Sequence, residues 1–164
     1  MPALHRVGQF FGHLNARVDP DEVTPVRGIL PANAFALFEQ MPTADRRHGL
    51  DVMGRLLAAG RDDPELLAAA LLHDAAKGNR MRLWHRVGGV LFDALAPGLL
   101  KRLASPDPAS RRYPFHLYLH HAELSAALAL EAGCGDRTAA FIRGTAAEPD
   151  AAAAAALLAA DGES

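Results

Sequence analysis

The sequence predicts an all-α fold, a single-domain helical bundle, on the strength of three observations. Half of the residues are apolar, yet only 6% are aromatic. Much of the apolar content is alanine and leucine, which favour helices, whereas β-branched residues are scarce. Proline and glycine divide the chain into helix-sized pieces, and none of these pieces alternates in the manner of a strand. A length of 164 residues suits one domain with its own hydrophobic core.

The first half of the chain is expected to form five helices, whose boundaries follow from capping residues, prolines and glycines. The first is amphipathic and covers Leu4 to Val18. The second begins with the acidic turn at residues 19–22, and the third begins at Pro31. The fourth runs from Pro42 to Gly60 with Thr43 as its N-cap, and the fifth runs from residues 62–65 to His73-Asp74.

The second half of the chain is expected to form five further helices between proline and glycine breaks. They are Met81 to Ala96, Pro97 to Arg102, Pro114 to Ala132, Asp136 to Ala147, and Pro149 to Ala160. The alanine run at residues 151–156 is strongly helix-forming. We therefore expect it to form the outer turns of a closely packed last helix.

Composition excludes several classes of function. The 17 basic and 19 acidic residues leave a net charge of −2, which does not suit a protein that binds nucleic-acid duplexes. Cys134 is the single cysteine, so there is no intrachain disulfide framework and no cysteine-based zinc site. No run of 18 apolar residues suggests a membrane span. We expect a soluble, cytoplasmic protein without a membrane partner, and the sequence leaves a homodimer open.

The pair His73-Asp74 is the most informative feature of the sequence, because it closes the apolar run at residues 66–72. An imidazole and a carboxylate can be buried cheaply only when they are hydrogen-bonded, paired or bound to an ion. Neighbours three and four positions away share a helix face. By that test three side chains are predicted to face the core: His48 beside Val52, His73 beside Ala69 and Ala70, and Asp161 beside Leu157 and Leu158.

Two histidines and two aspartates form a mixed nitrogen and oxygen donor set. Such a set suits Mn²⁺, Fe²⁺, Co²⁺ or Zn²⁺ better than Ca²⁺ or Mg²⁺. Four protein ligands on an octahedral ion leave two positions for water or substrate. An ion with open positions can lower the pKa of bound water and polarise a phosphoryl oxygen, as hydrolysis requires.

These residues resemble the HD-domain metal-dependent phosphohydrolases, a superfamily of all-helical domains with an ordered His, His-Asp and Asp ligand pattern. The similarity covers residues 46–50, 70–78 and 157–161, and spans roughly 42 to 162. It implies an HD-type domain over residues 42–164, with residues 1–41 as a helical extension packed on it. The resemblance also implies one divalent metal and a small phosphorylated substrate, probably a nucleotide or dinucleotide. The implied metal ligands are His48, His73, Asp74 and Asp161.

Residues 119–126 resemble the histidine-containing helix that adds ligands for a second metal in dinuclear members. Those members usually place another histidine after an Ile-Arg pair, where this chain has Gly144-Thr145. A mononuclear centre is therefore expected, and a second metal is not. His121 would then lie near the open side as a general acid, a general base or a phosphate ligand.

A phosphohydrolase of this kind would need further groups around the metal, of which the resemblance itself implies Lys77 as a phosphate-facing cation. Asp74 or Asp161 would orient the attacking water, and Lys77 would stabilise charge on the phosphate. A cationic and polar rim for substrate would comprise Arg47, Lys77, Arg80, His85, Arg86 and His120, with Arg82 and Arg112 as further candidates.

Three alternatives remain open. His116 and His120 stand four positions apart and could chelate zinc, with Glu123 nearby or orienting a histidine. The domain could be a catalytically inactive sensing or interaction module, with or without a structural metal. The buried histidines and aspartates could also satisfy one another without any metal.

Overall fold

The computed structural model describes residues 17–78 and 97–162, and its regular structure within these ranges is entirely helical, which confirms the predicted fold class. The predicted helix at Met81 to Ala96 lies outside the described residues. Of the predicted helix at Leu4 to Val18, only the last two residues are described, and neither is helical. No helix among the described residues is long and apolar enough to cross a bilayer.

Among the described residues, three short helices come first, α2 (Pro20–Val23), α3 (Val26–Ile29) and α4 (Ala32–Gln40). Helix α2 starts where the sequence predicted, because Asp19 and Glu22 form a reciprocal capping box. Buried side chains of α3 and α4 join the same hydrophobic core as the helices that follow. Part of the predicted N-terminal extension therefore shares its core with residues beyond position 42.

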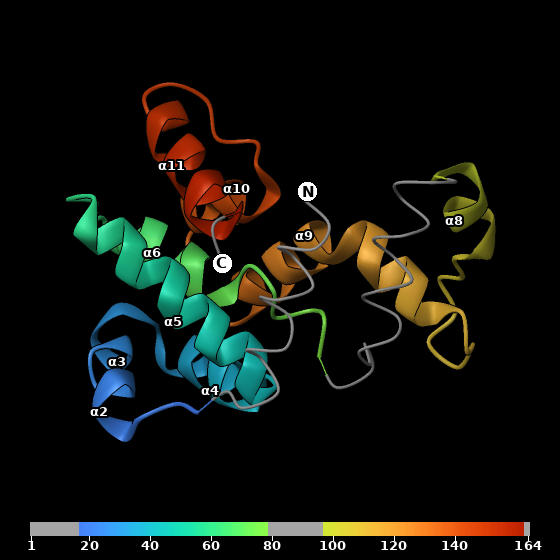
Figure 1. Cartoon of the computed structure of the whole chain (residues 1–164), viewed down its shortest axis with the longest axis horizontal. Coiled ribbons are helices and arrows are strands. Elements are labelled where there is room, and N and C mark those ends of the chain that lie inside the picture. The colour runs from blue at the N-terminus through green and yellow to red at the C-terminus, as the bar shows by residue number, and fades with distance from the viewer. Residues whose placement is uncertain (1–16, 79–96, 163–164) are drawn as a thin grey trace, which may run out of the picture.

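Helices α5 (Thr43–Ala58) and α6 (Pro64–Leu72) pack side by side and carry much of the core (Figure 1). The expectation that Thr43 caps α5 is wrong: the N-cap is Pro42, and no side chain caps this end. At the start of α6, Asp63 does cap the helix, because its carboxylate accepts hydrogen bonds from the backbone N–H groups of Glu65 and Leu66.

Helix α6 is central to the described fold. All seven residues from Leu66 to Leu72 are buried, and α6 contacts α3, α5, α9, α10 and α11. Its approach to α5 is close at Gly49, where an added Cβ would lie 3.1 Å from the carbonyl oxygen of Leu71. A helix buried on every side can end inside the protein, and α6 brings His73 and Asp74 to its interior end.

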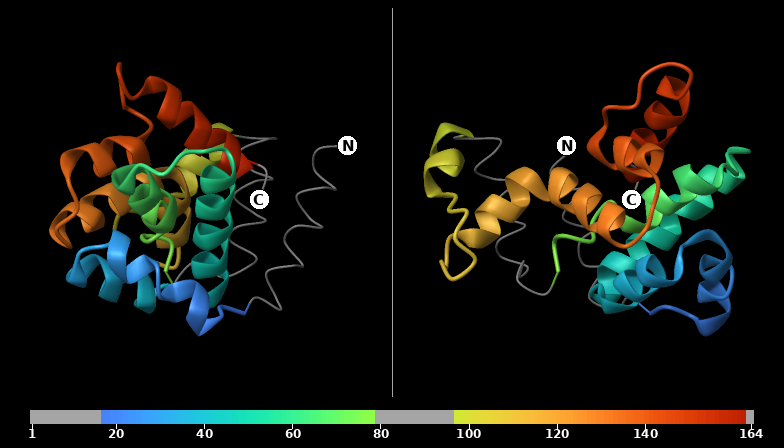
Figure 2. Two further views of the ribbon diagram at one scale, coloured as in Figure 1. Left: turned by 90° about the vertical axis from the view of Figure 1, so that its left-hand side faces the viewer. Right: turned by 180° about the vertical axis from the view of Figure 1, so that it is seen from behind.

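The C-terminal half contains α8 (Pro97–Leu103), α9 (Tyr113–Glu131), α10 (Asp136–Arg143) and α11 (Ala151–Gly162). Helix α9 is long and runs from α8 toward the α5–α6 pair (Figures 1 and 2). Helix α10 packs against α9 and α6, and α11 packs against α5 and α6. The prediction that α10 extends to Ala147 is wrong. Gly144 adopts a left-handed conformation with φ 69° and ends this helix four residues earlier than expected.

Candidate metal centre

His73 is positioned by the last turn of α6. It is the C-cap residue, and its ring Nδ1 lies 2.9 Å from the carbonyl oxygen of Ala70. Because a carbonyl only accepts, Nδ1 must carry the proton of this hydrogen bond. A neutral His73 ring therefore has its lone pair on Nε2. A hydrogen bond from the distal ring nitrogen to a backbone carbonyl is typical of metal-ligating histidines.

Three donor atoms from three helices converge at this point. The Nε2 atoms of His48 and His73 are 3.1 Å apart, and the Oδ1 atom of Asp161 lies 2.9 Å from the first and 3.3 Å from the second. Ligand atoms at about 2.1 Å from one ion, with angles between octahedral and tetrahedral values, lie about 3.0 to 3.4 Å from one another. The spacing of these three donors is thus close to that of ligands around a single ion.

Asp74 adds a buried carboxylate, with only 3% of its side chain exposed. Its Oδ2 atom accepts a hydrogen bond from Lys77 Nζ at 2.6 Å. Its Oδ1 atom lies 3.8 Å from His73 Nε2 and has no hydrogen-bond partner among the described residues. A buried carboxylate oxygen without a donor is costly, and a cation would remove that cost.

The charges in the group also suit a cation. Burial opposes ionisation of Asp74, but Lys77 and His73 outweigh it and hold its pKa well below the usual range. Burial likewise opposes ionisation of Asp161, and hydrogen bonds from His48 and from the protonated ring of His73 outweigh it and lower its pKa. Burial disfavours the charged imidazole of His73, but Asp74 and Asp161 outweigh this effect and raise its pKa. Both carboxylates are therefore ionised at neutral pH.

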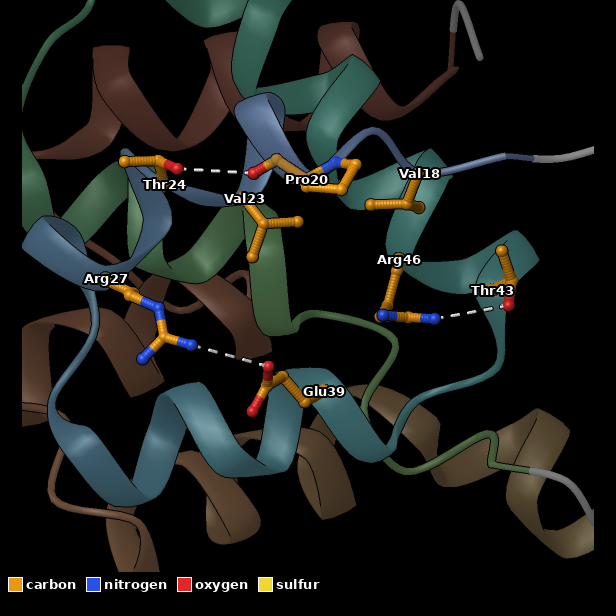
Figure 3. Close-up of a pocket in the computed structure, with 8 residues that line it drawn as sticks. All are labelled: Val18, Pro20, Val23, Thr24, Arg27, Glu39, Thr43 and Arg46. Carbon is orange, nitrogen blue, oxygen red and sulfur yellow. Dashed lines mark hydrogen bonds and ion pairs between the residues drawn. The ribbon is translucent and has the colours of Figure 1, made fainter.

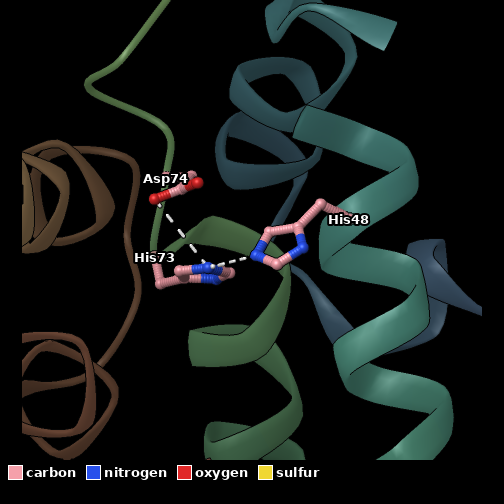
Figure 4. A group of neighbouring side chains, drawn as sticks. All are labelled: His48, His73 and Asp74. Atoms are coloured by element: carbon pink, nitrogen blue, oxygen red, sulfur yellow. Dashed lines mark hydrogen bonds and ion pairs between the residues drawn. The ribbon is translucent and has the colours of Figure 1, made fainter. Parts of the chain in front are cut away.

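His48, His73 and Asp74 form a group that could hold a metal ion, with one donor atom from each lying within 4.8 Å of the others (Figure 4). Asp161 contacts both histidines from α11, on the more exposed side, with 42% of its side chain accessible. Nitrogen and oxygen donors in this ratio fit a divalent transition metal. The four side chains named from the sequence as metal ligands therefore lie close together in the fold.

The turn after Asp74 is held by a residue that the sequence reasoning missed. The hydroxyl oxygen of Ser125, a fully buried residue of α9, accepts a hydrogen bond from the backbone N–H of Ala76 at 3.0 Å. This contact links α9 to the residues that carry Asp74 and Lys77. A lone hydroxyl within the apolar stretch at residues 124–130 was the available signal.

A cavity of about 450 Å³ opens beside the group. His73, His121 and Asp161 line it, together with Arg143 at the end of α10, and most of the other lining residues are apolar residues of α9, α10 and α11. His121 is held by a hydrogen bond from Nδ1 to the carbonyl oxygen of Tyr118 at 2.9 Å. Burial, followed by the charge of Lys77, lowers the pKa of His121, so that its ring is neutral at pH 7. The lone pair then resides on Nε2.

Only part of the predicted substrate rim lies among the described residues, and some of that part already has other partners. Arg80, His85 and Arg86, like Arg82, lie outside the described residues. Arg47 is already paired, at 2.6 Å with Glu22 and at 2.8 Å with Asp51. Of the predicted rim, only Lys77 is shown in contact with a residue of the metal-binding group.

Three further candidates on or near α9 have other partners. His120 is exposed and its ring lies against that of His116, with ring centroids 4.4 Å apart. Glu123 pairs with Arg143 at 3.0 Å, so the interpretation that it orients a histidine is not what the structure shows. The guanidinium of Arg112 donates to the carbonyl oxygens of Arg102 and Leu103 and thereby caps α8.

A second cavity, of about 410 Å³, lies between α2, α4 and the start of α5 (Figure 3). Its two guanidinium groups have partners within it. Arg27 lies 3.9 Å from Glu39, and Arg46 donates to the hydroxyl of Thr43 at 3.3 Å. None of the predicted metal ligands lines this cavity.

Comparison with known proteins adds no family assignment, since no family model, no curated protein and no solved structure matches this chain.

Proposed function

We propose that this protein is a metal-dependent phosphohydrolase that acts on a small phosphorylated molecule, such as a nucleotide or dinucleotide. The observation that carries the proposal is the buried Oδ1 atom of Asp74, which has no hydrogen-bond partner in the part of the chain that the structure describes and lies in one group with His48 and His73. A divalent Mn, Fe, Co or Zn ion held by His48, His73, Asp74 and Asp161 would activate water and polarise a phosphoryl oxygen.

The chain's own residues would supply the remaining functions. Asp161 is partly exposed beside the cavity and can orient a water molecule through its carboxylate. The ammonium group of Lys77 lies next to Asp74 and can stabilise negative charge that develops on a phosphate. His121 is neutral and lines the same cavity, so its Nε2 atom can accept a proton.

The second candidate is a catalytically inactive module with or without a structural metal. It is favoured by the ion pairs that occupy Lys77, Arg47 and Arg143, since each of these cations already has a carboxylate partner. A module of this kind would hold the same metal ligands and would show no turnover.

Metal content is the first test. Wild-type protein is expected to carry about one equivalent of transition metal by elemental analysis, and His73→Ala is expected to lose most of it together with several degrees of Tm. His116→Ala is the control, because His116 lies on α9 and its ring contacts those of Tyr113 and His120 rather than the metal-binding group. Unchanged metal content and Tm in His73→Ala would contradict both metal-based functions.

Turnover is the second test, with metal-loaded protein and three substrate classes: nucleoside monophosphates, dinucleoside polyphosphates and cyclic dinucleotides. Hydrolysis that falls at least a hundredfold in both Asp74→Asn and Asp161→Asn supports the enzyme. Absence of turnover in a fully loaded wild-type sample favours the inactive module.

A further inference from the structure

The cavity beside the candidate metal centre has one wall made by a single face of α11. Ala151, Ala154, Ala155 and Leu158 line it, and Asp161 follows on the same face. These positions are spaced by three or four residues, which is the spacing of one helix stripe. A ligand held at Asp161 would therefore meet this stripe next.

Most lining residues contributed by the other helices are also apolar. Phe141 and Ile142 of α10 are buried core residues that line the cavity, and Ala122 of α9 adds a methyl group. The lining cation Arg143 is paired with Glu123. Away from His73, His121 and Asp161, the cavity therefore offers methyl groups and an aromatic ring, and no uncompensated charge among the residues that line it.

Alanine has no atoms beyond Cβ, so the stripe leaves little side-chain bulk on the α11 side of the cavity that Phe141 also lines. The stripe also has a defined length. At 1.5 Å per residue, Ala155 lies about 9 Å along the α11 axis from Asp161, and Ala151 about 15 Å. That length suits a flat ring joined to a phosphate through a short linker, as in a nucleoside phosphate.

We propose that the alanine stripe of α11 is a specificity surface that receives the aromatic ring of a phosphorylated substrate, while the phosphate lies at the His73–Asp161 end. This inference rests on the proposed function for the position of the phosphate. It adds a substrate class, aromatic phosphate esters, and a determinant, the absence of side-chain bulk at Ala154 and Ala155. Sugar phosphates, which have no aromatic ring, gain nothing from this surface.

Ala155 and Ala152 provide a matched pair of variants, because both are exposed residues of α11 and only Ala155 lines the cavity. The probes are two phosphonates that cannot be hydrolysed, 2-naphthylmethylphosphonate and methylphosphonate. Their binding to manganese-loaded protein is measured by titration calorimetry. Wild-type protein is expected to bind the naphthyl compound at least tenfold more tightly than the methyl compound. Ala155→Phe should reduce this ratio to about twofold or less, and Ala152→Phe should keep it.

The outcomes separate this inference from the proposed function. A ratio near one in wild-type protein, or a ratio that Ala155→Phe leaves intact, overturns the specificity surface and does not affect the hydrolase proposal. A high ratio lost in Ala155→Phe, in a protein that hydrolyses none of the substrate classes, supports the surface and contradicts the enzyme. If neither phosphonate binds, both proposals fail. Ala155→Leu serves in the same role if the phenylalanine variant has a lowered Tm.

Discussion

His48 on α5 and Asp161 on α11 lie 2.9 Å apart between Nε2 and Oδ1, although 113 positions separate them in the sequence. Both also contact His73 at the end of α6. One small group of side chains thereby connects three helices, and changes in this group are expected to affect stability and metal binding together.

Removal of the cation beside Asp74 should destabilise the metal-free protein. Lys77→Met leaves a buried carboxylate without its partner at 2.6 Å, which we expect to cost about 2–3 kcal/mol. For a domain of this length that corresponds to a Tm lower by roughly 5–10 °C. The measurement is thermal unfolding in the presence of a chelator.

Added Zn²⁺ should restore more stability to Lys77→Met than it adds to wild-type protein, because the ion supplies a substitute positive charge at Asp74. Lys101→Met on the exposed part of α8 is the control and should change Tm by less than about 1–2 °C. An equal Tm for Lys77→Met and wild type would show that the carboxylate does not depend on this pair.

The pH dependence of stability should reverse sign when metal is bound. The raised pKa of His73 in the metal-free fold means that its protonation stabilises the folded state fully below its unfolded pKa of about 6.5. That contribution is lost as pH rises through the folded pKa. Metal binding requires the neutral imidazole, so metal affinity should fall by about tenfold per pH unit for each proton displaced below that pKa.

The gap in Tm between metal-loaded and chelator-treated samples is therefore expected to widen between pH 5.5 and pH 8. Both carboxylates have lowered pKa values and remain ionised over this range, so they do not contribute to the trend. A constant gap across the range would contradict the assignment of the histidines as ligands.

Gly49 should be intolerant of a side chain. A Cβ at this position would meet the carbonyl oxygens of Leu71 and Ala70 at 3.1 and 3.2 Å, and backbone atoms cannot move aside cheaply. Gly49→Ala is expected to cost about 1–3 kcal/mol and to weaken metal binding, because it separates α5 from α6 beside His48. Urea denaturation and metal titration measure the two effects.

Gly54 offers the opposite result on the same helix. A Cβ there has no neighbour within 4 Å, and its residue is exposed. Gly54→Ala should stabilise the protein by about 0.5–1 kcal/mol without changing metal affinity. If the two alanine variants behaved alike, the close approach of α5 and α6 would not be the cause.

Ser125 should act on the metal centre through the turn that follows Asp74. Ser125→Ala leaves the N–H of Ala76 without its acceptor, at an expected cost of about 1–2 kcal/mol, and loosens the position of Asp74. Metal affinity should fall severalfold. Ser110→Ala, which removes a comparable hydrogen bond in the turn before α9, should leave metal affinity intact. A Ser125→Ala variant with wild-type affinity would limit Ser125 to stability alone.

The sequence predicted those parts of the site that local pattern determines. The apolar run of α6 placed His73 and Asp74 at an interior helix end, and the neighbours of His48 indicated its inward direction. The prediction that Asp161 faces the core is only partly right, because 42% of its side chain is exposed and its neighbour Leu158 is 74% exposed. The sequence analysis assigned Arg47 to the substrate rim and missed its pairing with Asp51, although the two residues stand four apart on one helix. Capping by Asp63 followed its sequence signature, whereas at Pro42-Thr43 the helix starts without one.

Contacts between distant elements were not predictable from one sequence. Glu22 reaches Arg47 from α2, and Glu123 reaches Arg143 from α9, because the helix packing brings them together. The alanine run predicted the last helix but not what surrounds it. From the sequence alone, an alanine such as Ala155 that packs on a neighbour cannot be distinguished from one that lines a cavity. The position of the cavity follows from where α9, α10 and α11 meet.

The contact between His48 and Asp161 also bears on chain entropy, since it closes a loop of more than a hundred residues. The conformational entropy that a cross-link removes from the unfolded chain grows slowly with the length of the loop it closes. A bond that persisted on unfolding, treated as a disulfide around a loop of this size, would be worth about 4–5 kcal/mol at 25 °C. A metal ion that stayed bound to His48 and Asp161 on unfolding would constrain most of the chain in the same way, and chelation would remove that constraint in one step.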